Sequence, residues 1–188
     1  MSRGLGDVYK RQRGKVDEPI NIVQLKSFAA DLDLKGDSFV PKCAPSTGKK
    51  VAIVGGGPAG IAAAYFLARE GAAVTVFEKE KKAGGVIRYV IPGFRIGDDA
   101  IDKDISFIEK MGVKICTNTE ITSVAELKAQ GYDAVILAIG AGKPGTLKLK
   151  KGETVNALKF LRDFKANDGS LDIGKNVVVI GGGNTAMD

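Results

Sequence analysis

The most specific chemical signal in the sequence is a glycine loop. The apolar run VAIV at residues 51–54 leads into Gly55, Gly57 and Gly60, which match the spacing G-x-G-x-x-G. Such glycines permit a tight turn, let a pyrophosphate approach the backbone and let the next helix pack closely, with its positive end facing the phosphates. The pattern alone is weak because 25 of the 188 residues are glycine, but the flanking strand and helix support a dinucleotide site. The candidate contacts are Gly55, Gly56, Gly57, Pro58, Ala59 and Gly60.

A carboxylate stands where the ribose of such a dinucleotide is expected. Glu78 follows the apolar run AVTVF at residues 73–77. A carboxylate here accepts hydrogen bonds from a ribose diol and repels a 2′-phosphate, so this site should prefer FAD or NAD over NADP. Gly84 and Gly85 follow six and seven residues later. That spacing is similar to the FAD-type signature of flavoproteins with two dinucleotide-binding domains. An α/β unit with an empty crevice is the alternative.

The elements that must position these residues alternate along the chain. We expect strands at 51–54, 73–79, 113–116 and 132–140, and helices at 58–71, 98–112 and 123–131. Ser123 and Glu126 occupy capping-box positions in the last of these helices. This alternation predicts an α/β fold with parallel strands and right-handed crossovers. A helix within 17–32, a linker at 35–50, a helix at 157–166 and a strand at 175–183 complete the expected elements.

Composition excludes several functional classes. The chain has no histidine, only Cys43 and Cys116 as cysteines with no CxxC spacing, and no apolar run long enough for a membrane. We therefore expect no metal site, no disulfide framework, no secretory signal, and a cytoplasmic location. Half of the formal net charge of +6 lies in residues 1–13, so the charge does not indicate a nucleic-acid partner. GLGDVYKRQ resembles translated sequencing adapter, and 1–13 is expected to be a non-native leader or else a disordered basic one.

Longer segments carry a family resemblance. GGVIRYVIPGFRI, the helix ending EKMGVKI and the second glycine loop, VVVIGGGNTA, resemble the glutamate synthase small-subunit family, which includes the flavin-binding half of dihydropyrimidine dehydrogenase. Within it, FLRDFKANDGSLDIGKNVVVIGGGNTAMD is most similar to a bacterial selenate reductase-like subunit. The resemblance covers residues 17–188. It implies an iron–sulfur region preceding this segment and an FAD domain that is interrupted by an NADPH domain.

The resemblance assigns further residues. It places FAD contacts at Gly55–Ala59, Glu78, Gly85 and Val86, Arg95 and Ile121, and a crossover toward the nicotinamide domain at Gly140, whose alternative is a plain turn after a buried strand. Arg95 would pair with phosphate or with charge on the reduced flavin, or else be solvated. Arg88, in the same loop, is left open. The NADPH motif supplies Gly181, Gly183, Asn184 and Thr185.

The expected protein is a Rossmann-like FAD-binding domain of a flavoprotein with two dinucleotide-binding domains, truncated at the start of its NAD(P)-binding domain. Residues 14–49 form a helix and linker, 50–145 the first part of the FAD domain, and 146–188 a connection and the NAD(P) entrance. NADPH would reduce FAD, which would pass electrons to iron–sulfur clusters and a partner domain. The cluster cysteines are absent, so this chain should hold no cluster, and we assign no catalytic residue. A flavin-free NAD dehydrogenase and a non-catalytic dinucleotide-binding module remain open.

Overall fold

The computed structural model describes residues 16–18, 20–36, 39–142, 145, 147 and 149–188, so the expected leader at 1–13 lies outside the described residues. The chain divides into two units, residues 1–39 and residues 40–188. In the part that the structure describes, no helix has both the length and the apolar character needed to cross a membrane.

The first unit contains one described helix, α2 (Ile22–Lys35), which confirms the helix expected there. Its N-cap is Asn21, whose side chain accepts a hydrogen bond from the Gln24 N–H at 3.2 Å. This bond satisfies one of the amides that a helix start leaves without a partner. Leu25 and Phe28 on this helix are exposed.

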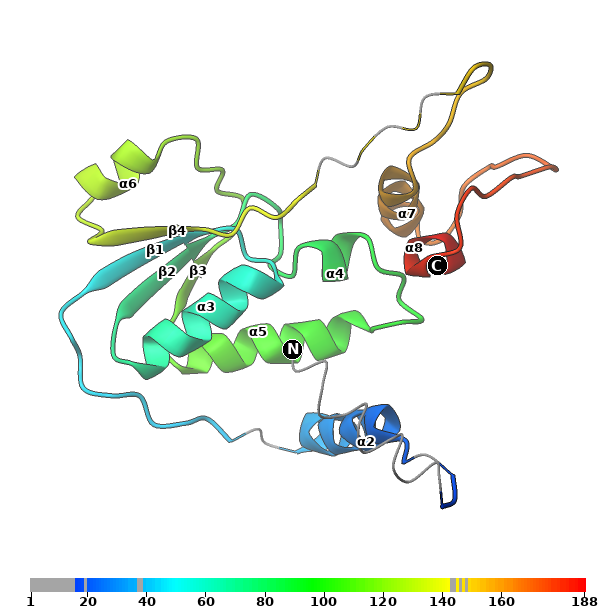
Figure 1. Ribbon diagram of the computed structural model, residues 1–188. Coiled ribbons are helices and arrows are strands. Elements are labelled where there is room, and N and C mark those ends of the chain that lie inside the picture. Colours follow the sequence, from blue (N-terminus) through cyan, green and yellow to red (C-terminus); the bar gives the residue numbers. More distant parts are fainter. Residues whose placement is uncertain (1–15, 19, 37–38, 143–144, 146, 148) are drawn as a thin grey trace. The chain divides into compact units, whose positions relative to one another are not determined.

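The second unit is built on a four-stranded parallel sheet, as the alternating pattern predicts (Figure 1). The strands are β1 (Lys50–Val54), β2 (Ala73–Phe77), β3 (Lys114–Cys116) and β4 (Ala134–Leu137), in the order β3-β2-β1-β4. In register, Val54 lies beside Phe77 and Leu137. The carboxyl ends of β1, β2 and β4 therefore meet at one edge, where loops of an open α/β sheet bind ligands.

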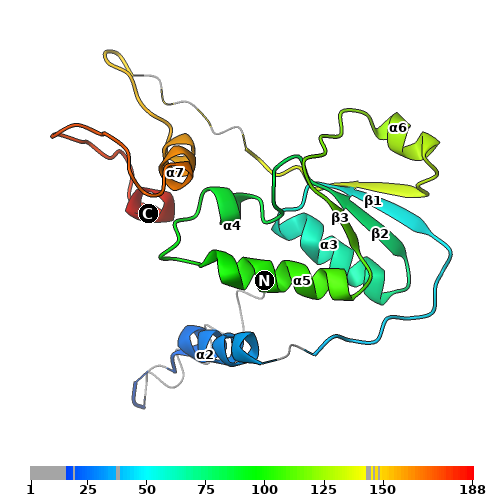
Figure 2. The same ribbon diagram turned by 180° about the vertical axis from the view of Figure 1, so that it is seen from behind.

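Helices cover both faces of the sheet, as Figures 1 and 2 show. Helices α3 (Pro58–Arg69) and α5 (Asp98–Lys110) pack over one face, and α6 (Val124–Ala129) lies over the other. On β1, Ile53 joins the cluster beneath α3 and α5, whereas Ala52 and Val54 join Leu127 of α6. Burial on both faces explains why the apolar run VAIV does not alternate with polar residues.

The capping box expected at the start of α6 is wrong. Ser123 is the N-cap residue, but its side chain makes no capping hydrogen bond. The helix is instead fixed by Leu127, whose side chain is fully buried beneath it. Tertiary packing therefore supplies what the local motif was expected to supply.

The remaining described helices are α4 (Val86–Tyr89), α7 (Ala157–Ala166) and α8 (Asn184–Met187). Helix α7 confirms the helix expected at 157–166, and the Asn156 side chain caps it by accepting from the Leu158 and Lys159 N–H groups.

The strand expected at 175–183 is not formed. Residues 177–180 belong to no helix or strand, and Val178 is 86% exposed. A buried parallel strand requires a hydrogen-bonded neighbour and an apolar cover on each face. The described residues provide this segment with neither.

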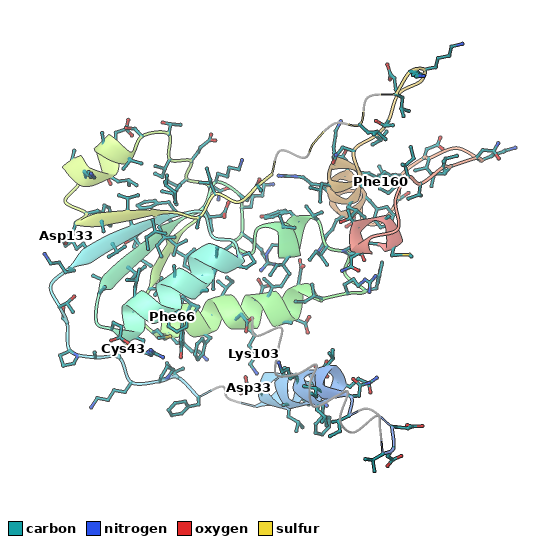
Figure 3. The ribbon with its side chains drawn as sticks, viewed as in Figure 1. Asp33, Cys43, Phe66, Lys103, Asp133 and Phe160 are labelled. Atoms are coloured by element: carbon teal, nitrogen blue, oxygen red, sulfur yellow. The ribbon has the colours of Figure 1, made fainter. Side chains whose placement is uncertain are left out.

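Asp133 fastens the opposite end of the sheet, where β4 begins (Figure 3). Its carboxylate accepts from the Lys50 N–H at 2.8 Å, and Lys49 Nζ lies 3.3 Å away. The Lys50 hydrogen bond, and then that of Lys49, hold the pKa of Asp133 below its usual value. Because the folded pKa is the lower one, the contact stabilises the fold above an unfolded pKa of about 3.9 and is lost as the pH falls through the folded pKa.

The sheet centre yields a test of this packing. We predict that Ile53→Ala lowers the free energy of unfolding by about 2–5 kcal/mol, because Ile53 is fully buried and truncation leaves a cavity. Val178→Ala is the control and should change it by less than about 0.5 kcal/mol. Urea unfolding measures both variants. An equal loss in the two would show that residues 177–180 are packed.

A candidate dinucleotide-binding site

The turn between β1 and α3 requires glycine at two positions. Gly55 has a φ of 106°, and its N–H donates to the Phe77 carbonyl at 2.8 Å. A Cβ added to Gly55 would strike the Ala138 carbonyl oxygen beyond β4, and one added to Gly60 would overlap the Gly55 carbonyl oxygen. The first and third glycines of the motif thus allow the helix to start directly against the sheet.

The start of α3 is suited to an anion. The helix has 12 residues, Gly57 is its N-cap without a side chain, and Pro58 occupies its first turn. The first amides of a helix have no acceptor within it, and the aligned peptide dipoles make this end positive. An added Cβ on Gly57 would approach only the Gly85 Cα, at 3.8 Å. A phosphate can therefore approach the backbone here.

Glu78 lies directly beside this loop. Its side chain is buried, its Oε2 accepts from the Gly56 N–H at 2.7 Å, and its Oε1 accepts from the Glu80 N–H at 2.9 Å. The register of β1 and β2 explains the contact, since the two strands end together at Val54 and Phe77. A carboxylate held at the mouth of the glycine loop is placed to accept further hydrogen bonds from a diol.

The glycine pair packs on the first glycine loop. The Gly84 N–H donates to the Gly56 carbonyl at 2.8 Å, and Gly85 has a φ of 56°. A Cβ added to Gly85 would lie 2.8 Å from the Gly57 Cα. The structure therefore brings together backbones that are almost thirty residues apart in sequence, Gly56–Gly57 and Gly84–Gly85.

Arg88 is a buried cation behind the glycine pair. Its Nε donates to the Ala83 carbonyl at 2.6 Å, its Nη2 donates to Asp102 at 2.5 Å, and its Nη1 lies 3.4 Å from Asp98. Both carboxylates belong to the first turns of α5. Burial alone would raise the pKa of Asp102, but the hydrogen bonds from Arg88 and then Lys82 outweigh it and lower that pKa. The sequence did not decide whether Arg88 has a functional role. The aspartates at the start of α5 are the sequence feature that could have identified its partners.

Other expected contacts lie around this centre or apart from it. Val86 begins α4 directly after the glycine pair, and Ile121 packs on the Ala52–Val54–Leu127 cluster. Gly140 has a φ of 72°, with no atom within 4 Å of an added Cβ. Arg95 is half-exposed, donates to Asp188 at 2.7 Å and lies over the Phe94 ring.

The second glycine motif is not arranged like the first. Gly181 and Gly183 precede α8, a helix of four residues, and no described strand leads into them. Asn184 and Thr185 lie within that helix. These four residues therefore do not form a strand, turn and helix unit like the one around the loop at Gly55–Gly60.

Comparison with known proteins places this geometry in context. A family model described as pyridine nucleotide-disulphide oxidoreductase matches residues 49–188, which include every element of the sheet. FprA of Mycobacterium tuberculosis has a similar fold, with a TM-score of 0.52 and 24% identity over 63% of this chain and 28% of that one.

Curated relatives are much longer. "Putative oxidoreductase YgfK" of Escherichia coli is 42% identical over 190 residues, which cover 96% of this chain and 18% of that protein. The NADPH-Fe(3+) oxidoreductase subunit beta of Geobacter sulfurreducens is 42% identical, covering 94% and 28%. PreT, an NAD-dependent dihydropyrimidine dehydrogenase subunit of Escherichia coli, is 37% identical, covering 94% and 43%. The chain thus spans less than half the length of each.

The contact between the two glycine loops can be tested with a matched pair of variants. Gly85→Ala and Gly140→Ala both place a side chain at a positive φ, which costs about 1–2 kcal/mol of stability. We predict a larger loss for Gly85→Ala, because only its new Cβ meets another backbone. Urea unfolding compares the two. Equal losses would mean that the loops do not touch.

Proposed function

The chain belongs to the pyridine nucleotide-disulphide oxidoreductase family, and on this basis we propose that its second unit is the FAD-binding part of an NAD(P)H-dependent electron-transfer oxidoreductase. The observation that carries the proposal is the convergence of Gly56, Gly84 and the Glu78 carboxylate at the start of α3. This arrangement has a place for the pyrophosphate and a place for the ribose of an adenosine diphosphate moiety.

The residues present fit that moiety. Gly57 leaves the backbone open at the start of α3, where a pyrophosphate would lie, and the first amides of α3 offer it hydrogen bonds. Glu78 would accept hydrogen bonds from the hydroxyls of the adenosine ribose. Its negative charge would repel a 2′-phosphate, so we expect FAD or NAD, and not NADP, at this loop.

Three considerations favour FAD over NAD here. The glycine pair follows Glu78 at the spacing of two-domain flavoproteins. The family name describes enzymes that use a pyridine nucleotide, which would occupy a site of its own beside that of FAD. A second glycine motif at Gly181–Gly183 would be the start of that pyridine nucleotide site in a longer protein. FAD, when bound, supplies the ability to take a hydride from a nicotinamide and to release electrons singly. The protein orients its ring and excludes competing reactions.

The identity of the longer protein is also part of the proposal. The names of the relatives describe an NADPH-Fe(3+) oxidoreductase subunit and a dihydropyrimidine dehydrogenase subunit. The dihydropyrimidine dehydrogenase name supports placement with glutamate synthase small-subunit-like proteins. The resemblance of residues 160–188 supports the selenate reductase-like group among them. In such a protein the electrons would pass to iron–sulfur clusters and then to a partner domain or subunit. NADPH would bind at Gly181, Gly183, Asn184 and Thr185, and Arg95 would lie near the flavin.

FAD titration of this chain tests the proposal. We expect weak binding, because the residues assigned to FAD contact mainly its adenosine and pyrophosphate. Glu78→Ala should weaken it further by about 1–3 kcal/mol, the cost of losing hydrogen bonds to a charged group. The change in flavin fluorescence on binding measures the affinity, and circular dichroism checks that the variant is folded.

The neighbouring carboxylate gives the matched control. Glu80→Ala removes an ion pair with Arg162 and keeps the backbone N–H that binds Glu78, so FAD affinity should stay within about twofold. Undiminished FAD affinity in Glu78→Ala would move the ribose contact elsewhere. Binding of NAD but not FAD would favour a flavin-free dehydrogenase.

A further inference from the structure

The loop that carries the glycine pair contains no helix or strand. Residues 78–85 connect β2 to the four-residue helix α4, and both Gly84 and Gly85 have positive φ angles. Glycine loses more conformational freedom on folding than any other residue. A loop of this composition requires outside contacts to keep Gly85 against Gly57.

Arg88 makes such contacts. The side chain is 4% exposed, and its guanidinium joins the Ala83 carbonyl in the loop to Asp98 and Asp102 on α5. The planar, rigid fork of a guanidinium can hold several acceptors in fixed directions at once. The loop is thereby tied to a 13-residue helix that packs on the core.

The same side chain explains why residue 84 is glycine. A Cβ added to Gly84 would lie 2.8 Å from the Arg88 Cβ and 3.1 Å from its Nε. Arg88 therefore fills the space that a side chain at position 84 would need. Without a side chain, Gly84 can lie between Arg88 and Gly56, and its N–H donates to the Gly56 carbonyl.

We propose that Arg88 is a positioning residue for the pyrophosphate: by bridging the Ala83 carbonyl to Asp98 and Asp102, it holds the glycine pair against the first glycine loop in the geometry that receives a second phosphate. The inference rests on the proposed function, since it concerns the same dinucleotide site. It predicts selectivity for a pyrophosphate over a monophosphate, which a role in folding alone would not affect.

The measurement is the ratio of the AMP and ADP dissociation constants for the full chain, obtained from amide chemical-shift titrations. Arg88→Met should lower this preference for ADP by about three- to tenfold, the equivalent of one misplaced hydrogen bond to a phosphate. Arg88→Lys keeps the charge but not the fork, and should fall between wild type and Arg88→Met. The spectra also report whether each variant is folded.

Lys82→Met is the matched control. Lys82 pairs with the same Asp102 carboxylate, at 3.2 Å, through an exposed side chain that contacts no loop carbonyl. Its loss should leave the ratio unchanged. If Arg88→Met does not fold, Asp102→Ala supplies the ratio, since it removes the side-chain acceptor of Arg88 Nη2 and keeps the arginine.

The outcomes separate a positioning role of Arg88 from a role in folding alone. A ratio equal to that of wild type in folded Arg88→Met, or in Asp102→Ala in its place, would overturn the positioning role, even if stability falls. A parallel loss of AMP and ADP affinity would do the same. If the wild-type chain binds neither nucleotide, the proposed function fails and the inference fails with it.

Discussion

The hydrogen bond from the Gly56 N–H to the Glu78 carboxylate joins the two strand ends on which the site depends. It is possible because β1 and β2 are parallel and in register, so that both end at the same edge of the sheet. Gly55 then turns the chain sharply, and Gly60 lets α3 begin against the strand. The carboxylate, the turn and the helix start thus form one unit, with the glycine pair packed upon it.

Arg88, a buried cation next to the glycine pair, stabilises that unit. A guanidinium removed from water is costly unless its charge and its donors are paired. In Arg88, Nε donates to the Ala83 carbonyl and Nη2 to Asp102, and the buried Nη1 makes an ion pair with Asp98 but no hydrogen bond. Asp98 is shared, because its other oxygen lies 3.4 Å from Lys165 of α7. Lys165 also donates to the Ile91 carbonyl after α4. The segment at 157–166 is thereby connected to the loop that carries the glycine pair.

Local patterns predicted much of this fold because they report burial directly. The apolar runs at 51–54 and 73–77 and the helix at 98–110 form where expected. The spacing also predicted that the first glycine loop lies between a strand and a helix, and that Glu78 follows the second strand. The contact between Gly85 and Gly57 could not be predicted, because spacing does not say which backbones pack together. The partners of Arg88 depended on where α5 lies.

The two errors have one physical cause. An apolar run such as 177–180 predicts a strand only if neighbouring strands receive it, and Ser123 caps a helix only if its hydroxyl turns toward the amides. Both depend on tertiary surroundings that local sequence does not encode. The glycine loop was predicted more successfully because its requirements, a strand behind and a helix ahead, lie within twenty residues.

A crystal structure of this chain with FAD tests the proposed dinucleotide site most directly. We expect density for the pyrophosphate on the first amides of α3, beside the contact between Gly57 and Gly85, with the adenosine ribose hydroxyls on the Glu78 carboxylate. Density for the pyrophosphate away from α3, or a ribose that does not contact Glu78, would contradict it.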